Sequence, residues 1–306
     1  MILITGGAGF IGSHLVHRLV NDGHRVRILD LLWDTPEDPS SRQIANLAHF
    51  PVGVEFIRGD VRDPLAVRQA MTGVTTAFHL AALAGVHAST INPAPYYDVN
   101  VVGTERVLEA ATFAKVHQVI FASSSSVYGN APTPTPESTP TKPESPYAHS
   151  KILAEQRVRD WATSHGNATI IRPFTVYGPG QRPNMAVSRF MNALRNGQPI
   201  PIFGDGTITR DNTHVHDVVD ALRILLKHPA PFSTFNVGSG TSVSLLELGE
   251  EVGRALGLKP MFEFHPPQPG DAQHTQADLA HIQRELHWKP KYSLREGLRH
   301  TLKASQ

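Results

Sequence analysis

The sequence predicts an α/β fold in which helices cover both faces of a mostly parallel, doubly wound sheet. Short runs of Ile, Val, Leu and Phe alternate with helix-length amphipathic segments over the first half of the chain. A glycine-rich stretch joins the first apolar run to the first helical segment. The chain has 306 residues, which is enough for one large domain or two modest ones.

The expected elements follow the apolar periodicity. Strands are expected at residues 1–5, 25–30, 54–58, 75–79, 116–122 and 168–172, and helices at 11–21, 95–114 and 146–164. Two later runs with helical spacing, 279–286 and 294–302, are expected to pack within a second domain.

Proline content divides the chain. Residues 129–144 hold five prolines among Thr and Ser, so they are neither helix nor central strand. They are either a linker or, as we expect, an ordered surface loop near the active site. We predict a Rossmann-type domain over residues 1–172 that also receives part of 209–237. A smaller, irregular and discontinuous cap should occupy residues 173–306.

The overall composition excludes several classes of protein. The net charge is +1 with no long block of one sign, so nucleic acid is not an expected partner. The chain has no cysteine, which excludes disulfides and thiolate metal sites. No apolar run reaches the roughly 18 residues of a membrane span, and the N-terminus lacks a basic region before its apolar stretch. We expect a cytoplasmic protein that does not bind membranes.

The glycine-rich segment 5–12 has the context of a dinucleotide-binding loop, between a strand and a helix. Gly6 allows a sharp turn, Gly9 allows the backbone to approach a pyrophosphate, and Gly12 allows close helix packing. Asp30, at the end of the second strand, can accept hydrogen bonds from a ribose and repels a 2′-phosphate. The pattern therefore favours NAD over NADP, and the alternative is a tight turn that binds nothing.

A tyrosine and a lysine lie four residues apart in the helix expected at 146–164, hence on one face. The Lys151 ammonium and a positive nicotinamide ring should lower the pKa of the Tyr147 phenol, so Tyr147 can act as a general base. Lys151 would also orient the cofactor ribose. The alternative is a surface pair without chemistry.

Several motifs in order identify a resemblance. They are TGGAGFIG at 5–12, Asp30, Gly59-Asp60-Val61, His79-Leu80-Ala81-Ala82, Asn100-Val101-Val102-Gly103-Thr104, SSSSVYG at 123–129 and YAHSK at 147–151. With these motifs the chain resembles the extended short-chain dehydrogenase/reductase superfamily, in its branch of nucleotide-sugar epimerases and dehydratases, over nearly its whole length. The resemblance implies NAD as cofactor, a UDP-sugar as substrate, and a homodimer formed through the helices at 95–114 and 146–164.

The resemblance also assigns residues. Its catalytic set would be Ser124, Tyr147 and Lys151. The cofactor contacts would be Gly6, Gly9, Phe10, Ile11, Gly12, Asp30, Asp60, Val61, Leu80, Ala81, Ala82, Asn100, Tyr147 and Lys151.

The residues after Ser124 distinguish two reactions within this branch. Sugar 4,6-dehydratases carry Asp and Glu there, which protonate the C6 hydroxyl and remove the C5 proton. Ser125 and Ser126 have neither the acidity nor the basicity for that elimination. This favours a C4 epimerase that oxidises C4 and returns hydride to the opposite face. Dehydration or decarboxylation through the same 4-keto sugar, and a non-catalytic NAD-binding regulator, are the alternatives.

The resemblance to UDP-glucuronate 4-epimerases places Thr175 and Arg182 on the sugar carboxylate, with a surface or phosphate contact as the alternative for Arg182. Arg210 would bind the diphosphate and Asp271 the uridine ribose. His87 stands where the family often has Arg, near the substrate, and Ser125 and Ser126 would also line the sugar.

The chain contains 17 histidines. His214 and His216 are expected on one face of a strand. Because HExxH spacing is missing, we expect hydrogen-bonding histidines here and no metal site.

Overall fold

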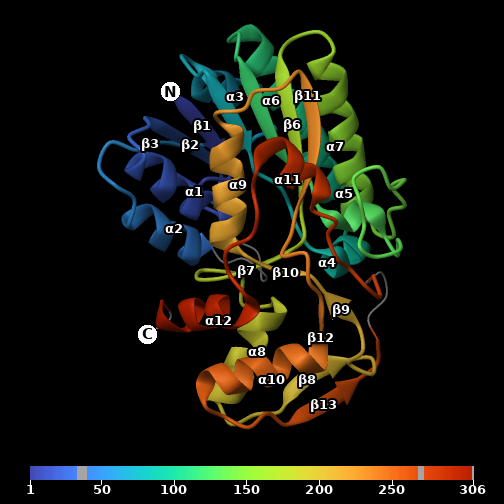
Figure 1. Cartoon of the computed structure of the whole chain (residues 1–306). Coiled ribbons are helices and arrows are strands. Elements are labelled where there is room, and N and C mark those ends of the chain that lie inside the picture. Colours follow the sequence, from blue (N-terminus) through green and yellow to red (C-terminus); the bar gives the residue numbers. More distant parts are fainter. Residues whose placement is uncertain (33–39, 268–271, 305–306) are drawn as a thin grey trace.

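The computed structural model describes residues 1–32, 40–267 and 272–304. Its larger domain is built on a parallel sheet with the strand order β11-β6-β5-β4-β1-β2-β3 (Figure 1). The strands are β1 (Ile2–Thr5), β2 (Val26–Asp30), β3 (Glu55–Arg58), β4 (Thr76–His79), β5 (Gln118–Ala122), β6 (Asn167–Pro173) and β11 (Phe232–Val237).

The order of the strands locates the ligand-binding crevice. From β1 the chain first adds β2 and β3 on one side, and then adds β4, β5, β6 and β11 on the other. In a sheet of this kind, ligands bind at the carboxyl ends of the strands where the winding direction reverses. That point lies between β1 and β4.

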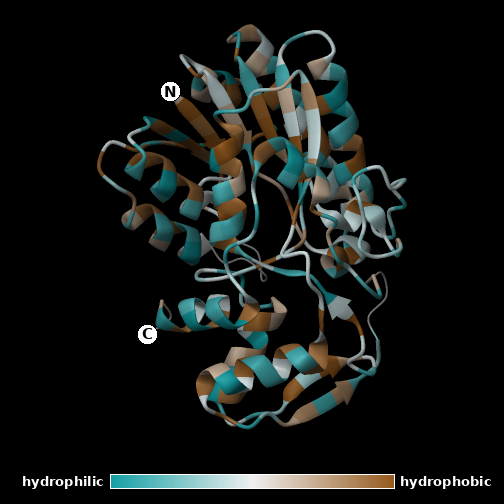
Figure 2. Cartoon of the chain, viewed as in Figure 1, coloured by the Kyte–Doolittle hydropathy of each residue, from teal (hydrophilic) through white to brown (hydrophobic). Residues whose placement is uncertain are grey.

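Helices cover both faces of the sheet. One face packs against α1 (Phe10–Asn21), α9 (Val215–Leu225) and α11 (Ala280–Leu286). The other packs against α3 (Pro64–Met71), α6 (Gly103–Phe113) and α7 (Pro146–Ala162). Figure 2 shows hydrophobic strands between helices that carry hydrophilic residues on their outer sides. Burial on both faces explains why the strands read as continuous apolar runs.

The smaller domain, or cap, lies below the sheet in Figure 1. It comprises α8 (Ala186–Arg195), α10 (Leu245–Leu256), α12 (Leu294–Lys303) and the parallel strands β8 (Ile200–Phe203) and β13 (Phe262–His265). Their apolar side chains form a separate core.

Short elements complete the structure. They are α2 (Ser40–Ala48), α4 (Val86–Ile91), α5 (Ala94–Tyr97), a π-helical turn (Asp98–Val102), a 3-10 turn (Ser125–Tyr128), β7 (Thr175–Tyr177) paired with β10 (Asn212–His214), and β9 (Thr209–Arg210) paired with β12 (Val243–Ser244). No helix among the described residues is both long and apolar enough to cross a bilayer.

The six strands predicted from sequence are present, each within two residues at either end. The helix expected at 95–114 is three consecutive helical pieces, including the π-helical turn. Two predictions were wrong. The helix at 279–286 packs on the sheet domain and not on the cap, because Ile282 and Leu286 enter the core beside β11. The segment at 214–216 is not one strand, because His214 ends β10 and α9 begins at Val215.

Candidate active site

The glycine loop between β1 and α1 forms a cradle of backbone. Gly6 has φ +71°, and a Cβ there would lie 2.7 Å from the backbone nitrogen of Ala81. Gly9 is the N-cap of α1 and offers no capping side chain, so the helix N-terminus presents N–H groups to a ligand. Phe10 and Ile11 open this helix. The cradle fits the pyrophosphate of a dinucleotide.

Asp30 connects the end of β2 to the glycine loop. Its Oδ2 accepts a hydrogen bond from the Ala8 amide at 2.9 Å, and its Oδ1 accepts one from the Leu32 amide at 3.0 Å. The predicted ribose contact of Asp30 stays a prediction, beside this role in positioning the loop.

Asp60 and Val61 follow β3. The Asp60 carboxylate accepts hydrogen bonds from the Arg62 amide at 2.8 Å and from the Arg62 guanidinium at 2.5–3.0 Å. Val61 is buried, and it lies so close to Gly103 that a Cβ at that glycine would be 2.7 Å from it. Their contact with adenine stays a prediction.

The loop after β4 carries Leu80, Ala81 and Ala82, all half-buried. Asn100 holds this loop: its amide accepts from the Leu83 nitrogen at 2.8 Å and donates to the Leu83 oxygen at 3.0 Å. It also donates to Ser150 Oγ at 2.9 Å. The predicted contact of Asn100 with the cofactor stays a prediction, beside this role in holding the loop.

His79 also fixes this loop, and this role was not predicted from the sequence. Its ring nitrogens contact Thr5 Oγ1 at 2.7 Å and Thr104 Oγ1 at 3.0 Å, which links β1, β4 and α6. Burial lowers its pKa to about 3, so the ring is neutral. A histidine within an apolar strand was the available signal.

The predicted catalytic serine and tyrosine come together. Ser124 is the N-cap of the 3-10 turn after β5, Tyr147 lies in the first turn of α7, and Ser124 lies close enough to Tyr147 to act on its phenol. Ser124 Oγ accepts from Ser126 Oγ at 2.8 Å and from the Ser126 amide at 3.2 Å. Because Ser124 accepts both bonds, its own proton can point to Tyr147 or to a sugar oxygen. Ser125 is half-buried in the same turn.

The proton affinity of Tyr147 differs from our expectation. Burial raises its pKa, and the Ser124 hydroxyl and the Arg182 charge partly oppose this. Lys151 donates instead to the Ala122 carbonyl at 2.8 Å, and burial lowers its own pKa to about 7. The predicted lowering of the Tyr147 pKa by Lys151 is therefore wrong for the protein alone, because burial dominates. The positive ring of NAD⁺ is the group that would favour the phenolate.

Arg182 reaches this site from the cap side. Its Nη1 donates to the Ala84 carbonyl at 2.8 Å, which places it beside the loop after β4, and its charge acts on Tyr147. His87 lies three residues further, on α4, and is exposed. Thr175 begins β7 and is half-buried. The structure thus places Arg182 near Tyr147, the predicted general base.

Arg210 belongs to β9, which pairs with β12, and its Nη1 donates to the Thr209 carbonyl at 3.0 Å. Asp271 lies outside the described residues. Asp211 follows Arg210 in the chain, and the sequence analysis assigned it no role. It is fully buried and accepts hydrogen bonds from the amides of Ser239, Gly240 and Ala277 at 2.7–3.0 Å, so it fixes the strand that carries Arg210.

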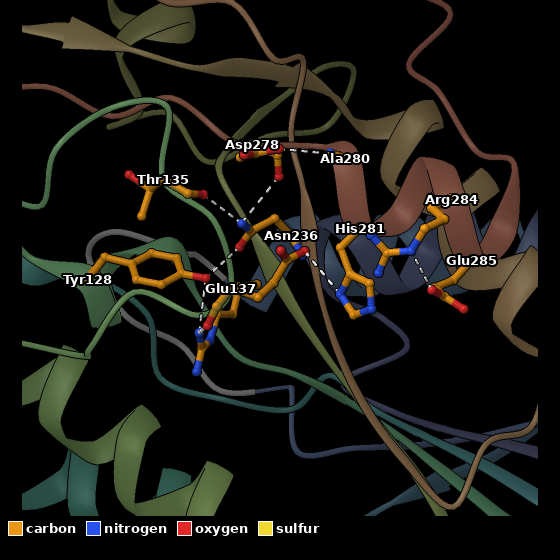
Figure 3. Close-up of polar contacts among 10 residues, drawn as sticks. Tyr128, Thr135, Glu137, Asn236, Asp278, Ala280, His281, Arg284 and Glu285 are labelled. Carbon is orange, nitrogen blue, oxygen red and sulfur yellow. Dashed lines mark hydrogen bonds and ion pairs between the residues drawn. The ribbon is translucent and has the colours of Figure 1, made fainter.

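The proline-rich loop at 129–144 is neither helix nor regular strand, as predicted, and Asn236 fastens it to the sheet (Figure 3). The Asn236 amide donates to the Thr135 carbonyl at 2.8 Å and accepts from Tyr128 Oη at 2.7 Å. Glu137 Oε1 accepts from the Asn236 backbone at 2.7 Å. Since Tyr128 ends the turn that starts at Ser124, this network also supports the catalytic serine.

The fold and the site together define an extended short-chain dehydrogenase/reductase. A sequence profile of the NAD dependent epimerase/dehydratase family matches residues 2–238, and the chain belongs to this family.

Three relatives each match nearly all of the chain. A UDP-glucose 4-epimerase of Mycolicibacterium smegmatis is 40% identical over 98% of this chain and 96% of the relative. A UDP-glucuronate 4-epimerase of Thermodesulfobacterium geofontis is 33% identical over 99% and 95%. A dTDP-glucose 4,6-dehydratase of Streptomyces niveus is 30% identical over 98% and 91%, so overall similarity does not separate the two reactions.

Solved structures of nucleotide-sugar enzymes with bound NAD have the same fold. MoeE5, in complex with UDP-glucuronic acid and NAD, superimposes with a TM-score of 0.90 at 37% identity, covering 99% of this chain and 98% of that one. The UDP-glucuronic acid 4-epimerase of Bacillus cereus, in complex with UDP-glucuronic acid and NAD, has a TM-score of 0.93 at 30% identity with the same coverage.

Proposed function

We propose that this protein is an NAD-dependent 4-epimerase whose substrate is UDP-glucuronate. The observation that carries this proposal is the position of the Tyr147 phenol, on which both the Ser124 hydroxyl and the Arg182 guanidinium act. A proton acceptor, a hydroxyl donor and a cation for a carboxylate therefore belong to one site. NAD, when bound, accepts a hydride from C4 of the sugar and returns it.

Side chains of the protein transfer the proton of the C4 hydroxyl. Tyr147 takes the proton of the C4 hydroxyl as the C4–H bond breaks, and Ser124 donates a hydrogen bond to O4. The 4-keto sugar rotates in the site, so that C4 is reduced on its opposite face. Tyr147 then returns the proton to O4. Lys151, tied to Ala122, keeps its remaining N–H groups for the cofactor ribose and for the phenolate.

The neighbours of Ser124 support epimerisation over dehydration. Ser126 donates to Ser124, and Ser125 is a second hydroxyl in the same turn. Neither can protonate a departing C6 hydroxyl or remove the C5 proton near neutral pH. A 4-keto intermediate formed from UDP-glucose, which carries the C6 hydroxyl, is therefore expected to be reduced again before it loses water. UDP-glucuronate has a carboxylate at C6 and cannot undergo this elimination.

Arg182 favours a sugar acid over a neutral hexose, because a guanidinium pairs with a carboxylate through two hydrogen bonds. The second candidate is UDP-glucose, on which the M. smegmatis relative acts by name. Arg210 would hold the diphosphate that both substrates share.

Product analysis separates these candidates. The enzyme should convert UDP-glucuronate to its C4 epimer at a higher kcat/KM than UDP-glucose. The Arg182→Gln variant should lose most activity on UDP-glucuronate and reverse that preference. Unchanged UDP-glucuronate alongside rapid conversion of UDP-glucose would contradict the proposed substrate, and release of a stable 4-keto product would contradict epimerisation.

We also propose a homodimer that forms through α6 and α7 and works in the cytoplasm. A hollow of about 430 Å³ between these helices is lined by Glu105, Leu108, Glu109, Thr112, Arg157, Trp161 and His165. Leu153, one turn before Arg157, is half-exposed. Leu153→Arg should therefore halve the mass measured by light scattering, whereas Leu65→Arg on α3 should not. Equal masses for the native protein and Leu153→Arg would contradict this interface.

A further inference from the structure

Three histidines from separate elements meet where the cap touches the sheet domain. His214 ends β10, His216 lies in the first turn of α9, and His300 lies in α12. One ring nitrogen from each lies within 4.8 Å of the others. The third member comes from 84 residues further along the chain, which is why the sequence did not reveal the group.

The spacing of the rings suits a metal ion. His214 Nε2 and His300 Nδ1 are 3.3 Å apart. Zn–N bonds of about 2.0–2.1 Å in a tetrahedral site place two ligand nitrogens about 3.3–3.4 Å apart. The ring centres of the three residues are 5.0, 5.1 and 4.7 Å from one another. The rings therefore surround one point at nearly equal distances.

The surroundings orient these rings. His216 Nδ1 lies 3.4 Å from Tyr292 Oη, so Nδ1–H can donate to the phenol and leave the Nε2 lone pair for a metal. Tyr292 also stacks on His214, with ring centres 4.2 Å apart.

We propose that His214, His216 and His300 form a binding site for a divalent transition-metal ion such as Zn²⁺, with water as the fourth ligand. An all-imidazole ligand set selects such ions over Mg²⁺ and Ca²⁺, which prefer oxygen. His214 Nδ1 accepts a 3.3 Å bond from the His216 amide, so the proton between His214 Nε2 and His300 Nδ1 belongs to His214. When the metal binds His214 Nε2, this proton moves to His214 Nδ1 and the bond from the His216 amide is lost.

The site is structural, since it joins α12 to the start of α9. His14, on the cofactor-binding helix α1, has its ring centre 5.2 Å from that of His216, and its Nε2 lies 2.8 Å from the Pro179 carbonyl. A bound metal would thus stiffen the contact between the cap and the helix that holds the pyrophosphate. It takes no part in the chemistry at Tyr147.

The test uses the full chain without a polyhistidine tag, after chelator treatment and dialysis. Calorimetric titration with ZnCl₂ should give one equivalent per chain, and CoCl₂ should give the visible absorption bands of tetrahedral Co²⁺. Zn²⁺ should also raise the melting temperature. His300→Gln should weaken Zn²⁺ binding at least about tenfold and remove the Co²⁺ bands.

His281→Gln is the matched control, because His281 is half-buried on α11 and lies outside the cluster. This variant should bind Zn²⁺ like the native protein. His216→Gln replaces His300→Gln if the latter does not fold by circular dichroism. The proposal fails if the native protein takes up no Zn²⁺, or if the cluster variant binds Zn²⁺ as tightly as His281→Gln does.

Discussion

Lys151 Nζ donates a hydrogen bond to the Ala122 carbonyl across 2.8 Å, which fixes an ammonium from α7 at the carboxyl end of β5. The Lys151 side chain is almost fully buried and lies 4.8 Å above the Phe121 ring. Removal from water is the largest influence on its charge and lowers its pKa to about 7. Burying the charged Lys151 side chain therefore lowers the free energy of unfolding.

This cost should vary with pH. The folded-state pKa of about 7 lies below the ordinary value of 10.5, so between these values the unfolded chain binds more protons and stability rises with pH. Lys151→Met removes the penalty. Its melting temperature should exceed that of the native protein most clearly near or below about pH 7, and the two should converge only as the pH approaches 10.5. The exposed Lys142→Met should show no such trend, and a pH-independent difference for Lys151→Met would contradict this account.

Replacing the tyrosine base should separate chemistry from binding. Tyr147→Phe loses the only atom that can take the C4 proton at this position, so kcat should fall at least about 10³-fold. The dissociation constant for NAD should change little. Tyr97→Phe is the matched control, because Tyr97 bonds to His149 on α7 and not to Ser124. Near-native turnover by Tyr147→Phe would remove the proposed base.

The hydroxyls of Ser124 and Ser126, which follow β5, should contribute unequally to catalysis. Ser124→Ala deletes the donor to O4 and should lower kcat about 10²–10³-fold, as expected for loss of a donor that stabilises developing charge. Ser126→Ala deletes only the bond that orients Ser124 at 2.8 Å, so its effect should be smaller and should fall on kcat more than on KM. If Ser126→Ala proves as damaging as Ser124→Ala, Ser126 contacts the substrate itself.

A buried ion pair supports the same end of the sheet. Arg172 and Glu155 meet at 2.6 Å with side chains only 5% and 6% exposed. Glu155→Gln leaves the guanidinium unpaired in the interior and should lower the free energy of unfolding by about 3–5 kcal/mol, measured by urea denaturation. The double variant Arg172→Met/Glu155→Leu should recover much of this loss. A single variant as stable as the native protein would show that water solvates Arg172.

Local sequence patterns predicted the parts of the fold that depend on local physics. The apolar runs of β1 to β6 and the glycine loop could be identified because each carries its own signal in consecutive residues. The Ser124–Tyr147 pairing was predicted only through the family resemblance, since 23 positions separate the two residues.

Features that depend on distant contacts were missed or misplaced. The apolar spacing at 279–286 predicted a helix but could not indicate which core receives Ile282 and Leu286. The alternation at 214–216 suggested a strand, yet His214 caps α9 by accepting from the His216 amide. The burial of Asp211 is compensated by backbone donors from two later segments, at residues 239–240 and 277, which no local pattern shows.

The route of the chain between its two domains affects how the protein is made. The seventh strand, β11, is synthesised only after α8 and β8 of the cap, and α11 follows α10 and β13. The sheet domain is therefore incomplete on the ribosome until most of the cap has emerged. Neither domain can complete its fold before the other has been partly synthesised. Dividing the chain at any one position would therefore not give two fragments that each contain a complete domain.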